Sequence, residues 1–255
     1  MLFIDELPVN VYAAQLHEYE ALPHYDCGNV ERYIAFKISN EDLSWEDVIT
    51  RVHLGLDYDS YTYVKSIEKP DGLTVLVNKY NQLPFSYIPA DLEVIAPEYN
   101  EGELVLRHKA RLAFEEMCRV AGGEGIGLKA ISTFRSAPYQ NDVYYRKLTS
   151  DISLEDYQKE RDKVSARAGF SEHQTGLAVD INDLEETFEA TPEGRWLADN
   201  CYRFGFVLRY PKGKEGITGY SYEPWHFRYL GLYLAEAVYQ SGLTFDEYYI
   251  RYLSY

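Results

Sequence analysis

The chain has 255 residues, of which 46% are hydrophobic and 26% are charged, as is ordinary for a globular protein that can bury a large core. Its 41 acidic residues outnumber the 25 basic ones and give a net charge of −16 at pH 7, which argues against nucleic acid as a partner because phosphate binding needs a basic surface. No apolar run reaches the roughly 18 residues that a membrane-spanning helix requires, so no membrane span is expected.

The cysteines and the first residues bear on the compartment of the protein. Cys27, Cys118 and Cys201 are far apart and form no CxxC pair, so we expect neither a thiolate metal site nor a disulfide framework, although one pair could still form a bridge. The N-terminal segment lacks a basic region and is interrupted by Asp5 and Glu6, so it does not resemble a signal peptide. This favours either a cytoplasmic protein or a chain that has been trimmed.

Residues 1–70 are predicted to form a separate extension that is mostly helical and to which no function is assigned. Apolar residues recur at helical spacing in the segments 30–37 and 44–57. Ser44 is placed to cap the second of these helices, and Asp47 supplies a carboxylate near the helix start. A Pro-Asp-Gly turn closes the extension.

Residues 71–255 alternate between strand and helix patterns. A strand is predicted over 73–80, and the segment 81–92 is an extended connection with two prolines. The remaining elements are predicted in this order: a helix over 103–121, a strand over 128–134, helices over 136–150 and 153–169, a strand over 176–182, a helix over 191–205, strands over 206–210 and 223–230, and helices over 231–242 and 244–253. Because helices come early and late with strands between them, the predicted fold class is α+β, with a central antiparallel sheet flanked by helices.

Two histidines and an aspartate accompany two of these strands. Side chains of a strand alternate between its faces, so Asp180 shares its face with a glycine and an alanine, while the larger apolar side chains face the core. The small neighbours leave room beside the carboxylate. His173 lies in the loop just before this strand, and His226 lies within the later, aromatic strand. The three side chains are candidate ligands of one metal ion.

Two imidazoles and one carboxylate suit zinc, since a catalytic zinc site takes three protein ligands and leaves one position open. Glu223 stands three residues before His226, and Pro224 keeps it outside the regular pleat. It is predicted to act as a general base toward a water whose pKa zinc lowers from about 15.7 toward about 7. The alternative is a buried histidine bonded to a nearby aspartate without a metal. The other histidines are interpreted as structural: His17, His24, His53 and His108.

The segment "ISTFRSAPYQ" places an arginine at the end of a predicted buried strand. Arg135 can therefore reach into a cleft, where a guanidinium stabilises a developing oxyanion or clamps a carboxylate. The alternative is a salt bridge to one of the 41 acidic residues.

Together these segments resemble the VanY-type D-alanyl-D-alanine carboxypeptidases, a family of zinc peptidases. The segment "SEHQTGLAVD" is similar to the family signature SxHxxGxAxD, "EPWHFRY" to ExxWHxRY, and "STFRSAPYQ" to SGYRSxxxQ. The segment 76–92 is similar to LVNKxxxLPxxYxPxDL, and the four motifs occur in family order. The wider group, which includes lysostaphin-type endopeptidases, D-Ala-D-Ala dipeptidases and the hedgehog signalling domain, implies the same α+β core around one zinc ion.

The resemblance implies a role for each matched residue. His173, Asp180 and His226 take the positions of the zinc ligands. Glu223 takes that of the general base, and Arg135 that of the arginine that stabilises the tetrahedral intermediate. The expected substrate contacts are Ser171, Gln140, Ser136 and Trp225.

One segment departs from the family pattern. Thr133 and Phe134 stand where the pattern has Gly and Tyr, so a hydrogen bond from that tyrosine hydroxyl is lost. The departure concerns substrate specificity and leaves the metal ligands unchanged.

The expected function is the removal of the C-terminal D-alanine from peptidoglycan stem peptides by a D,D-carboxypeptidase with one zinc ion per chain. The expected partner is a stem peptide or its precursor. Two alternatives are an L,D-carboxypeptidase that acts on tetrapeptide stems and a zinc-containing peptidoglycan-binding module without turnover, against which Glu223 argues. A cell-wall substrate implies the cell envelope or the extracellular space, and a cytoplasmic enzyme acting on precursors is the alternative.

Overall fold

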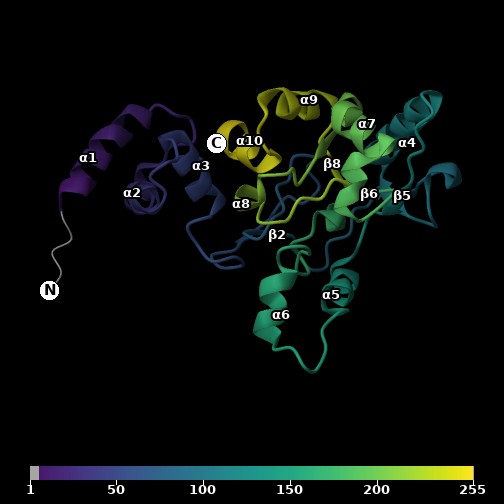
Figure 1. The fold of residues 1–255 in the computed structure, drawn as a ribbon, viewed down its shortest axis with the longest axis horizontal. Coiled ribbons are helices and arrows are strands. Elements are labelled where there is room, and N and C mark those ends of the chain that lie inside the picture. Colours follow the sequence, from purple (N-terminus) through teal and green to yellow (C-terminus); the bar gives the residue numbers. More distant parts are fainter. Residues whose placement is uncertain (1–5, 255) are drawn as a thin grey trace. The chain divides into compact units, whose positions relative to one another are not determined.

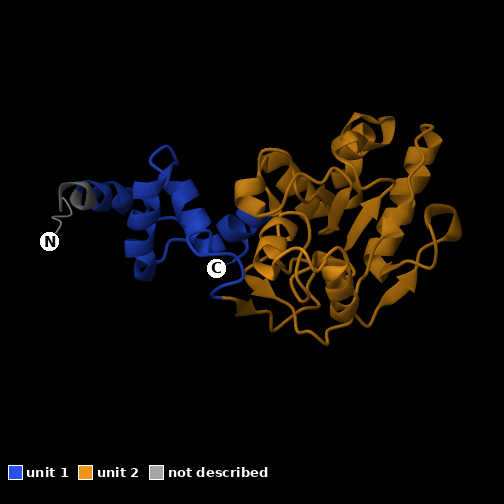
Figure 2. Cartoon of the chain, turned by 60° about the horizontal axis from the view of Figure 1, so that its bottom comes forward, with its two compact units in different colours: residues 1–63, 246–255 blue, residues 64–245 orange. Residues whose placement is uncertain are grey.

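The structure is a computed structural model that describes residues 6–254. The chain divides into two compact units (Figure 2): unit 1 comprises residues 1–63 and 246–255, and unit 2 comprises residues 64–245. Unit 2 therefore begins before the predicted boundary at residue 71 and ends before the last helix, which the sequence analysis assigned to the carboxypeptidase domain.

Unit 1 is helical. It contains α1 (Glu6–Leu16), α2 (Val30–Ser39), α3 (Trp45–Leu54), most of α10 (Phe245–Tyr252) and the short 3-10 helices η1 (His17–Tyr19) and η2 (Cys27–Asn29). These helices enclose a small core that includes Tyr33, Trp45 and Val48. Ser44 caps α3 as predicted, because its hydroxyl accepts the backbone N–H of Asp47 at 3.1 Å.

An arginine explains why the last helix belongs to unit 1. Arg251 of α10 donates to the carboxylate of Asp47 at 2.7 Å and to the hydroxyl of Thr50 at 3.1 Å, both on α3. Its guanidinium also lies 3.2 Å from Glu46. The two helices are therefore joined by polar contacts although most of the chain separates them, and the local pattern that predicted the helix could not reveal its partner.

Unit 2 is built around a four-stranded sheet in the order β5–β6–β8–β7, in which every neighbouring pair is antiparallel (Figure 1). The strands are β5 (Ala130–Ser132), β6 (Ala178–Ile181), β7 (Phe206–Leu208) and β8 (His226–Tyr229). The predicted α+β class with a central antiparallel sheet is confirmed. The two interior strands, β6 and β8, are those that carry candidate ligands.

A hydrophobic core joins the sheet to the helices α4 (His108–Gly123) and α7 (Pro192–Asn200). Val179 and Ile181 of β6 belong to this core and are fully buried. Because neighbouring side chains of a strand point to opposite faces, Asp180 between them faces away from the core.

The strand register brings polar residues together on that other face. Asp180 of β6 lies directly opposite His226 of β8 on one side and Ser132 of β5 on the other. Directly opposed residues of antiparallel strands have their Cβ atoms about 4.5–5.5 Å apart. The register alone therefore places a carboxylate beside an imidazole.

The remaining elements of unit 2 surround this sheet. β1 (Lys65–Ser66) pairs in parallel with β2 (Asn81–Gln82), and β3 (Leu92–Val94) pairs antiparallel with β4 (Val105–Arg107). The other helices are α5 (Ala137–Tyr145), α6 (Leu154–Arg161), α8 (Glu215–Thr218), α9 (Leu232–Ser241) and the 3-10 helices η3 (Pro97–Tyr99), η4 (Glu172–Thr175), η5 (Glu186–Ala190) and η6 (Cys201–Phe204). Within the part of the chain that is described, none of the helices is long and apolar enough to cross a membrane.

The strand predicted over 73–80 is wrong. This segment is irregular, although Leu76 and Val77 are buried. The carbonyl oxygens of Leu73 and Val75 accept hydrogen bonds from the Arg228 guanidinium, each at 2.9 Å, in place of a neighbouring strand.

Two further elements begin later than predicted. The helix expected from residue 103 begins at His108, because residues 105–107 form β4 and pair with β3. The strand expected from residue 223 begins at His226, whose backbone N–H donates to the carbonyl of Glu223 in a turn.

Candidate metal centre and active site

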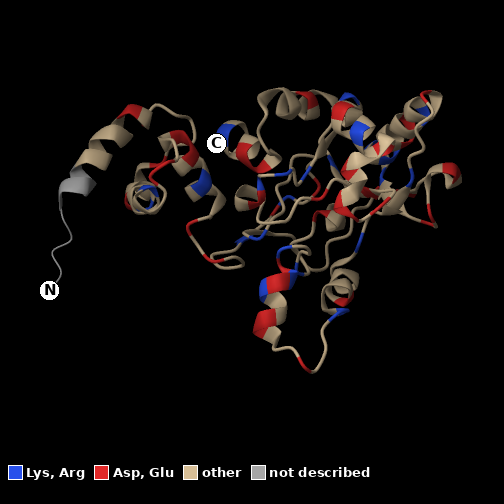
Figure 3. Ribbon diagram, viewed as in Figure 1, with Lys and Arg blue, Asp and Glu red and all other residues tan. Residues whose placement is uncertain are grey.

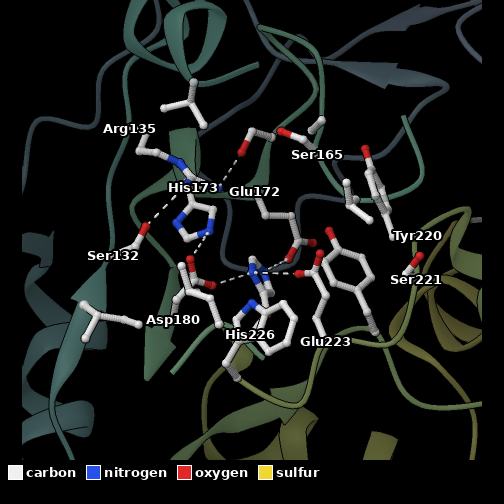
Figure 4. Close-up of a pocket in the computed structure, with 18 of the residues that line it drawn as sticks. Ser132, Arg135, Ser165, Glu172, His173, Asp180, Tyr220, Ser221, Glu223 and His226 are labelled. Atoms are coloured by element: carbon white, nitrogen blue, oxygen red, sulfur yellow. Dashed lines mark hydrogen bonds and ion pairs between the residues drawn. The ribbon is translucent and has the colours of Figure 1, made fainter. Parts of the chain in front are cut away.

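Three side chains converge at one buried point of unit 2. His173, Asp180 and His226 each offer one ligand atom, and these atoms all lie within 4.8 Å of one another. All three side chains are buried, and no other such group of His, Cys, Asp and Glu occurs among the side chains that the structure describes. Figure 4 shows them facing one another in a pocket. The structure thus brings together the residues that the sequence analysis proposed as ligands.

The neighbours of His173 leave one of its ring nitrogens free. Ser171 is the N-cap of η4, and its hydroxyl accepts a hydrogen bond from the backbone N–H of His173 at 3.3 Å. The ring Nδ1 lies 2.6 Å from the carbonyl oxygen of Thr133, and because a carbonyl can only accept, Nδ1 carries the proton. Burial and the nearby Arg135 lower the pKa of His173 to about 4, so the ring is neutral and Nε2 presents a lone pair.

That lone pair faces the carboxylate of Asp180. The distance from Nε2 of His173 to Oδ2 of Asp180 is 3.2 Å. Burial alone would raise the pKa of Asp180, yet the two histidines hold it well below its usual range, so the carboxylate is ionised. Two acceptors at this distance repel each other unless a cation lies between them. The pair therefore fits a bound metal ion, for which both atoms are suitable ligands.

His226 approaches the same carboxylate from the neighbouring strand. Its Nδ1 lies 2.9 Å from Oδ1 of Asp180 and 3.8 Å from Oε2 of Glu223. Its Nε2 lies 3.7 Å from Oε2 of Glu172. Burial lowers the pKa of His226, but the carboxylates of Asp180 and Glu172 outweigh burial and raise it to about 9. Carboxylates that attract a proton this strongly also favour a metal cation beside the ring.

Glu223 stands beside the three ligands without belonging to them. It lies in the turn before β8, and its backbone N–H donates to the carbonyl of Tyr210 at 3.1 Å. Burial raises the pKa of Glu223 to about 7, against the opposing effect of His226. A carboxylate that titrates near neutrality can take up a proton and give it back, as a general base and acid must.

Three arginines line the same pocket; Arg135 and Arg161 are half-buried, whereas Arg146 is exposed. Arg135 follows β5, and its Nη1 donates to the hydroxyl of Ser132 at 3.2 Å. Arg161 ends α6, and its Nη2 donates to the carbonyl of Val143 at 3.2 Å. Each has a buried Nε without a hydrogen-bond partner, and neither forms an ion pair with any residue that the structure describes. Both cations are therefore available to an anionic substrate.

The pocket has a volume of about 700 Å³, which is within the range of small-molecule and peptide sites. Tyr210, Tyr220 and Trp225 contribute aromatic surface to it, and Ser165 and Ser221 contribute hydroxyl groups. Several of these residues come from segments far apart in the sequence, as Figure 4 shows.

The four predicted substrate contacts fall into two pairs. Ser171 and Trp225 line the pocket. Ser136 is absent from the lining and caps α5, where its hydroxyl accepts the backbone N–H of Tyr139 at 3.4 Å. Gln140 is also absent from the lining. Its side-chain amide donates to the carbonyl of Ala166 at 2.7 Å, and Ala166 does line the pocket.

A buried charge cluster beside the ligands was not predicted from the sequence. Glu172 is 2% exposed, and its Oε1 accepts from Arg209 at 2.7 Å and from Arg228 at 2.9 Å. Burial alone would raise the pKa of Glu172, but the two arginines hold it well below its usual range. A signal was present in "FVLRY" and "WHFRYL", where arginines interrupt apolar strands, because a buried charge requires a partner.

Comparison with known proteins bears on the whole site. The family model VanY, D-alanyl-D-alanine carboxypeptidase, matches residues 103–232, a range that includes every residue discussed above as a ligand, base or pocket arginine. The YodJ protein of Bacillus subtilis, whose name describes a carboxypeptidase, is 39% identical over 196 residues, which are 73% of this chain and 70% of that protein.

Two solved structures are also similar. The LdcB LD-carboxypeptidase matches with a TM-score of 0.68 and 36% identity, over 74% of this chain and 91% of that one. The vancomycin-resistance D,D-pentapeptidase VanY, solved in complex with Zn(II), matches with a TM-score of 0.60 and 32% identity, over 69% of this chain and 97% of that one. The chain is thus an enzyme of the metallopeptidase type, and it belongs to the VanY family of D-alanyl-D-alanine carboxypeptidases.

Proposed function

We propose that this protein is a zinc-dependent D,D-carboxypeptidase that removes the C-terminal D-alanine from peptidoglycan stem peptides. The observation that carries the proposal is a buried His–Asp–His donor set beside a carboxylate that titrates near neutrality, in one pocket with two half-buried guanidinium groups. Membership of the VanY family supports the reaction class, and the donor set supports the metal.

One zinc ion per chain would be held by His173, Asp180 and His226. The fit rests on the chemistry of the donors: a neutral imidazole nitrogen faces an ionised carboxylate, and a second imidazole faces that carboxylate from the neighbouring strand. When bound, zinc lowers the pKa of a water molecule toward about 7 and polarises the scissile carbonyl. The VanY relative that was solved with Zn(II) supports the choice of metal.

Glu223 holds and moves the proton in this proposal. Its carboxylate takes a proton from the attacking water, whose oxygen bonds to the scissile carbonyl carbon. Glu223 then delivers that proton to the amine of the leaving D-alanine as the C–N bond breaks. The pKa of about 7 suits a group that must be a base in one step and an acid in the next.

The two arginines match the two negative charges of the reaction. Arg135 is bonded through its backbone N–H to the carbonyl of His173, which places it beside a proposed ligand, so we assign it to the developing oxyanion. Arg161 is then available for the terminal carboxylate of the substrate. The substrate of an endopeptidase brings no terminal carboxylate into the cleft, so only the developing oxyanion would need a guanidinium. Two guanidiniums without an ion-pair partner therefore favour an exopeptidase.

The similarity to LdcB favours one alternative, an L,D-carboxypeptidase that removes D-alanine from a tetrapeptide stem. Incubation of the zinc-loaded protein with pentapeptide and tetrapeptide stems, followed by mass measurement of the products, separates the two. Loss of one alanine from the pentapeptide with the tetrapeptide left intact supports the D,D activity. Cleavage of the tetrapeptide alone establishes the L,D alternative, and no product from either peptide indicates a binding module without turnover.

A further inference from the structure

A buried carboxylate behind the ligands is oriented by two arginines. The side chain of Glu172 is fully shielded from solvent, as are those of Arg209 and Arg228. Both guanidiniums donate to the same atom, Oε1 of Glu172, at 2.7 and 2.9 Å. Arg228 is itself anchored by the carbonyl oxygens of Leu73 and Val75. The carboxylate is therefore held through one oxygen, and its second oxygen has no hydrogen-bond partner.

That second oxygen faces a proposed metal ligand. Oε2 of Glu172 lies 3.7 Å from Nε2 of His226, and both atoms are buried without a hydrogen-bond partner. Leaving two complementary polar atoms unsatisfied in a protein interior costs free energy, and closing the gap between them needs only a small rotation of either side chain.

The position of the proton on His226 follows from its other nitrogen. Nδ1 of His226 faces Asp180 and the proposed metal, so in a zinc-bound neutral ring the proton must lie on Nε2. The acceptor within reach of Nε2 is Glu172. We infer that Glu172 is a positioning residue. Its Oε2 accepts a hydrogen bond from the Nε2–H of His226, and this bond fixes the tautomer and the ring orientation in which Nδ1 binds zinc.

This inference rests on the zinc part of the proposed function, and it adds a residue outside the ligand set. Histidine ligands of metals commonly donate their second N–H to a carboxylate, and loss of such a partner typically weakens metal binding about 10- to 100-fold. The arginines contribute by holding Oε1, which leaves only Oε2 for the histidine.

The test is the substitution Glu172→Gln, which preserves size but places an uncharged amide against the N–H of His226. Zinc affinity is measured on the full chain by competition with a chromophoric chelator at fixed pH, and we expect it to weaken about 10- to 100-fold. In the cobalt-loaded protein the visible absorption bands should shift, since the ring of His226 loses its orientation. Glu185→Gln is the matched control, because Glu185 lines the same pocket but is exposed, and the zinc affinity of this variant should equal that of wild type.

A measurement on wild type covers the case in which Glu172→Gln does not fold. With ¹⁵N-labelled histidine in the zinc-loaded protein, we expect His226 to carry an exchange-protected proton on Nε2 and His173 to carry its proton on Nδ1. A proton on Nδ1 of His226 would overturn the inference, as would an unchanged zinc affinity in a folded Glu172→Gln protein. Those results leave the proposed peptidase activity intact, whereas a protein that binds zinc as expected but cuts no stem peptide refutes the activity and spares the role of Glu172.

Discussion

Asp180 directs one carboxylate oxygen toward each histidine of the ligand set, so removal of either histidine leaves one of these oxygens without its neighbouring ligand. We expect His226→Ala to lose most of its zinc, since two remaining protein ligands hold the ion poorly. Elemental analysis of the purified proteins after zinc reconstitution measures this. His108→Ala is the control, because His108 is exposed and pairs with Glu93. A His226→Ala protein with full zinc content contradicts the ligand set.

Glu223 should affect the chemistry and leave the metal in place. Glu223→Gln keeps the size of the side chain but cannot accept a proton, so we expect kcat to fall by about 10²–10⁴. Zinc content should stay near that of wild type, because Glu223 lies outside the group of ligand atoms. Near-normal turnover would mean that another group is the base, and loss of zinc would make Glu223 a ligand.

Arg161 is predicted to recognise the end of the substrate. Arg161→Gln removes a charged hydrogen bond worth about 1.5–3 kcal/mol, so we expect a loss of about 10- to 100-fold in kcat/KM, mainly through KM. Wild type should fail to cut a stem peptide whose C-terminus is amidated.

The control for this prediction is Arg146→Gln, since Arg146 also lines the pocket but is exposed. If wild type cuts free and amidated peptides equally well, the exopeptidase assignment is wrong. If Arg161→Gln changes kcat alone, Arg161 acts on the chemistry and does not clamp the terminus.

Single residues could be predicted from the sequence where they lie in a motif of the family. The contacts that such residues make with distant segments could not be predicted, because they depend on the fold. The ligand set and Glu223 follow from two short motifs. Gln140 lies in a third motif, yet its amide is used to hold Ala166, a residue of another segment. Glu172 lies inside the first motif, but its importance depends on Arg209, which directly follows β7, and on Arg228 of β8, both far along the chain.

Among the elements, α5 shows how a predicted contact can be structural. Ser136→Ala removes the N-cap of α5, and we expect it to lower the free energy of unfolding by about 0.5–2 kcal/mol, while Ser136→Asp, which can also cap, retains most of the stability. Urea unfolding gives the stabilities, and stem-peptide kinetics should stay unchanged in both variants. A raised KM without a loss of stability would restore Ser136 as a substrate contact.

Element predictions failed where the partner lay outside the segment. In the segment 73–80, Leu76 and Val77 are buried, but the guanidinium of Arg228 takes the carbonyl oxygens of Leu73 and Val75 that a strand partner would have used. Residues 105–107 continue a helical pattern, yet they pair with β3 because that strand is adjacent in the fold. The apolar residues of a segment indicate whether it is buried, whereas its hydrogen-bond partner depends on tertiary packing.

For the whole molecule, the cysteines provide a simple probe of folding. Cys27 is exposed, whereas Cys118 and Cys201 are buried, and burial raises the pKa of Cys201 to about 12. All three are free thiols. We expect a thiol reagent to modify one cysteine in the native protein and three after denaturation. Fewer than three reactive thiols in the denatured, unreduced protein would reveal a disulfide bond.

The buried donor set of His173, Asp180 and His226 also links folding to metal supply. The three residues are assembled only when η4, β6 and β8 have come together, so the unfolded chain offers no comparable site. By mass action, a ligand that binds only the native state stabilises it by RT ln(1 + [L]/Kd), or about 2.7 kcal/mol at a hundredfold excess over Kd. With zinc bound as proposed, the melting temperature of unit 2 should therefore rise with free zinc and fall when a chelator is added, and the metal would then stabilise the fold as well as take part in the chemistry.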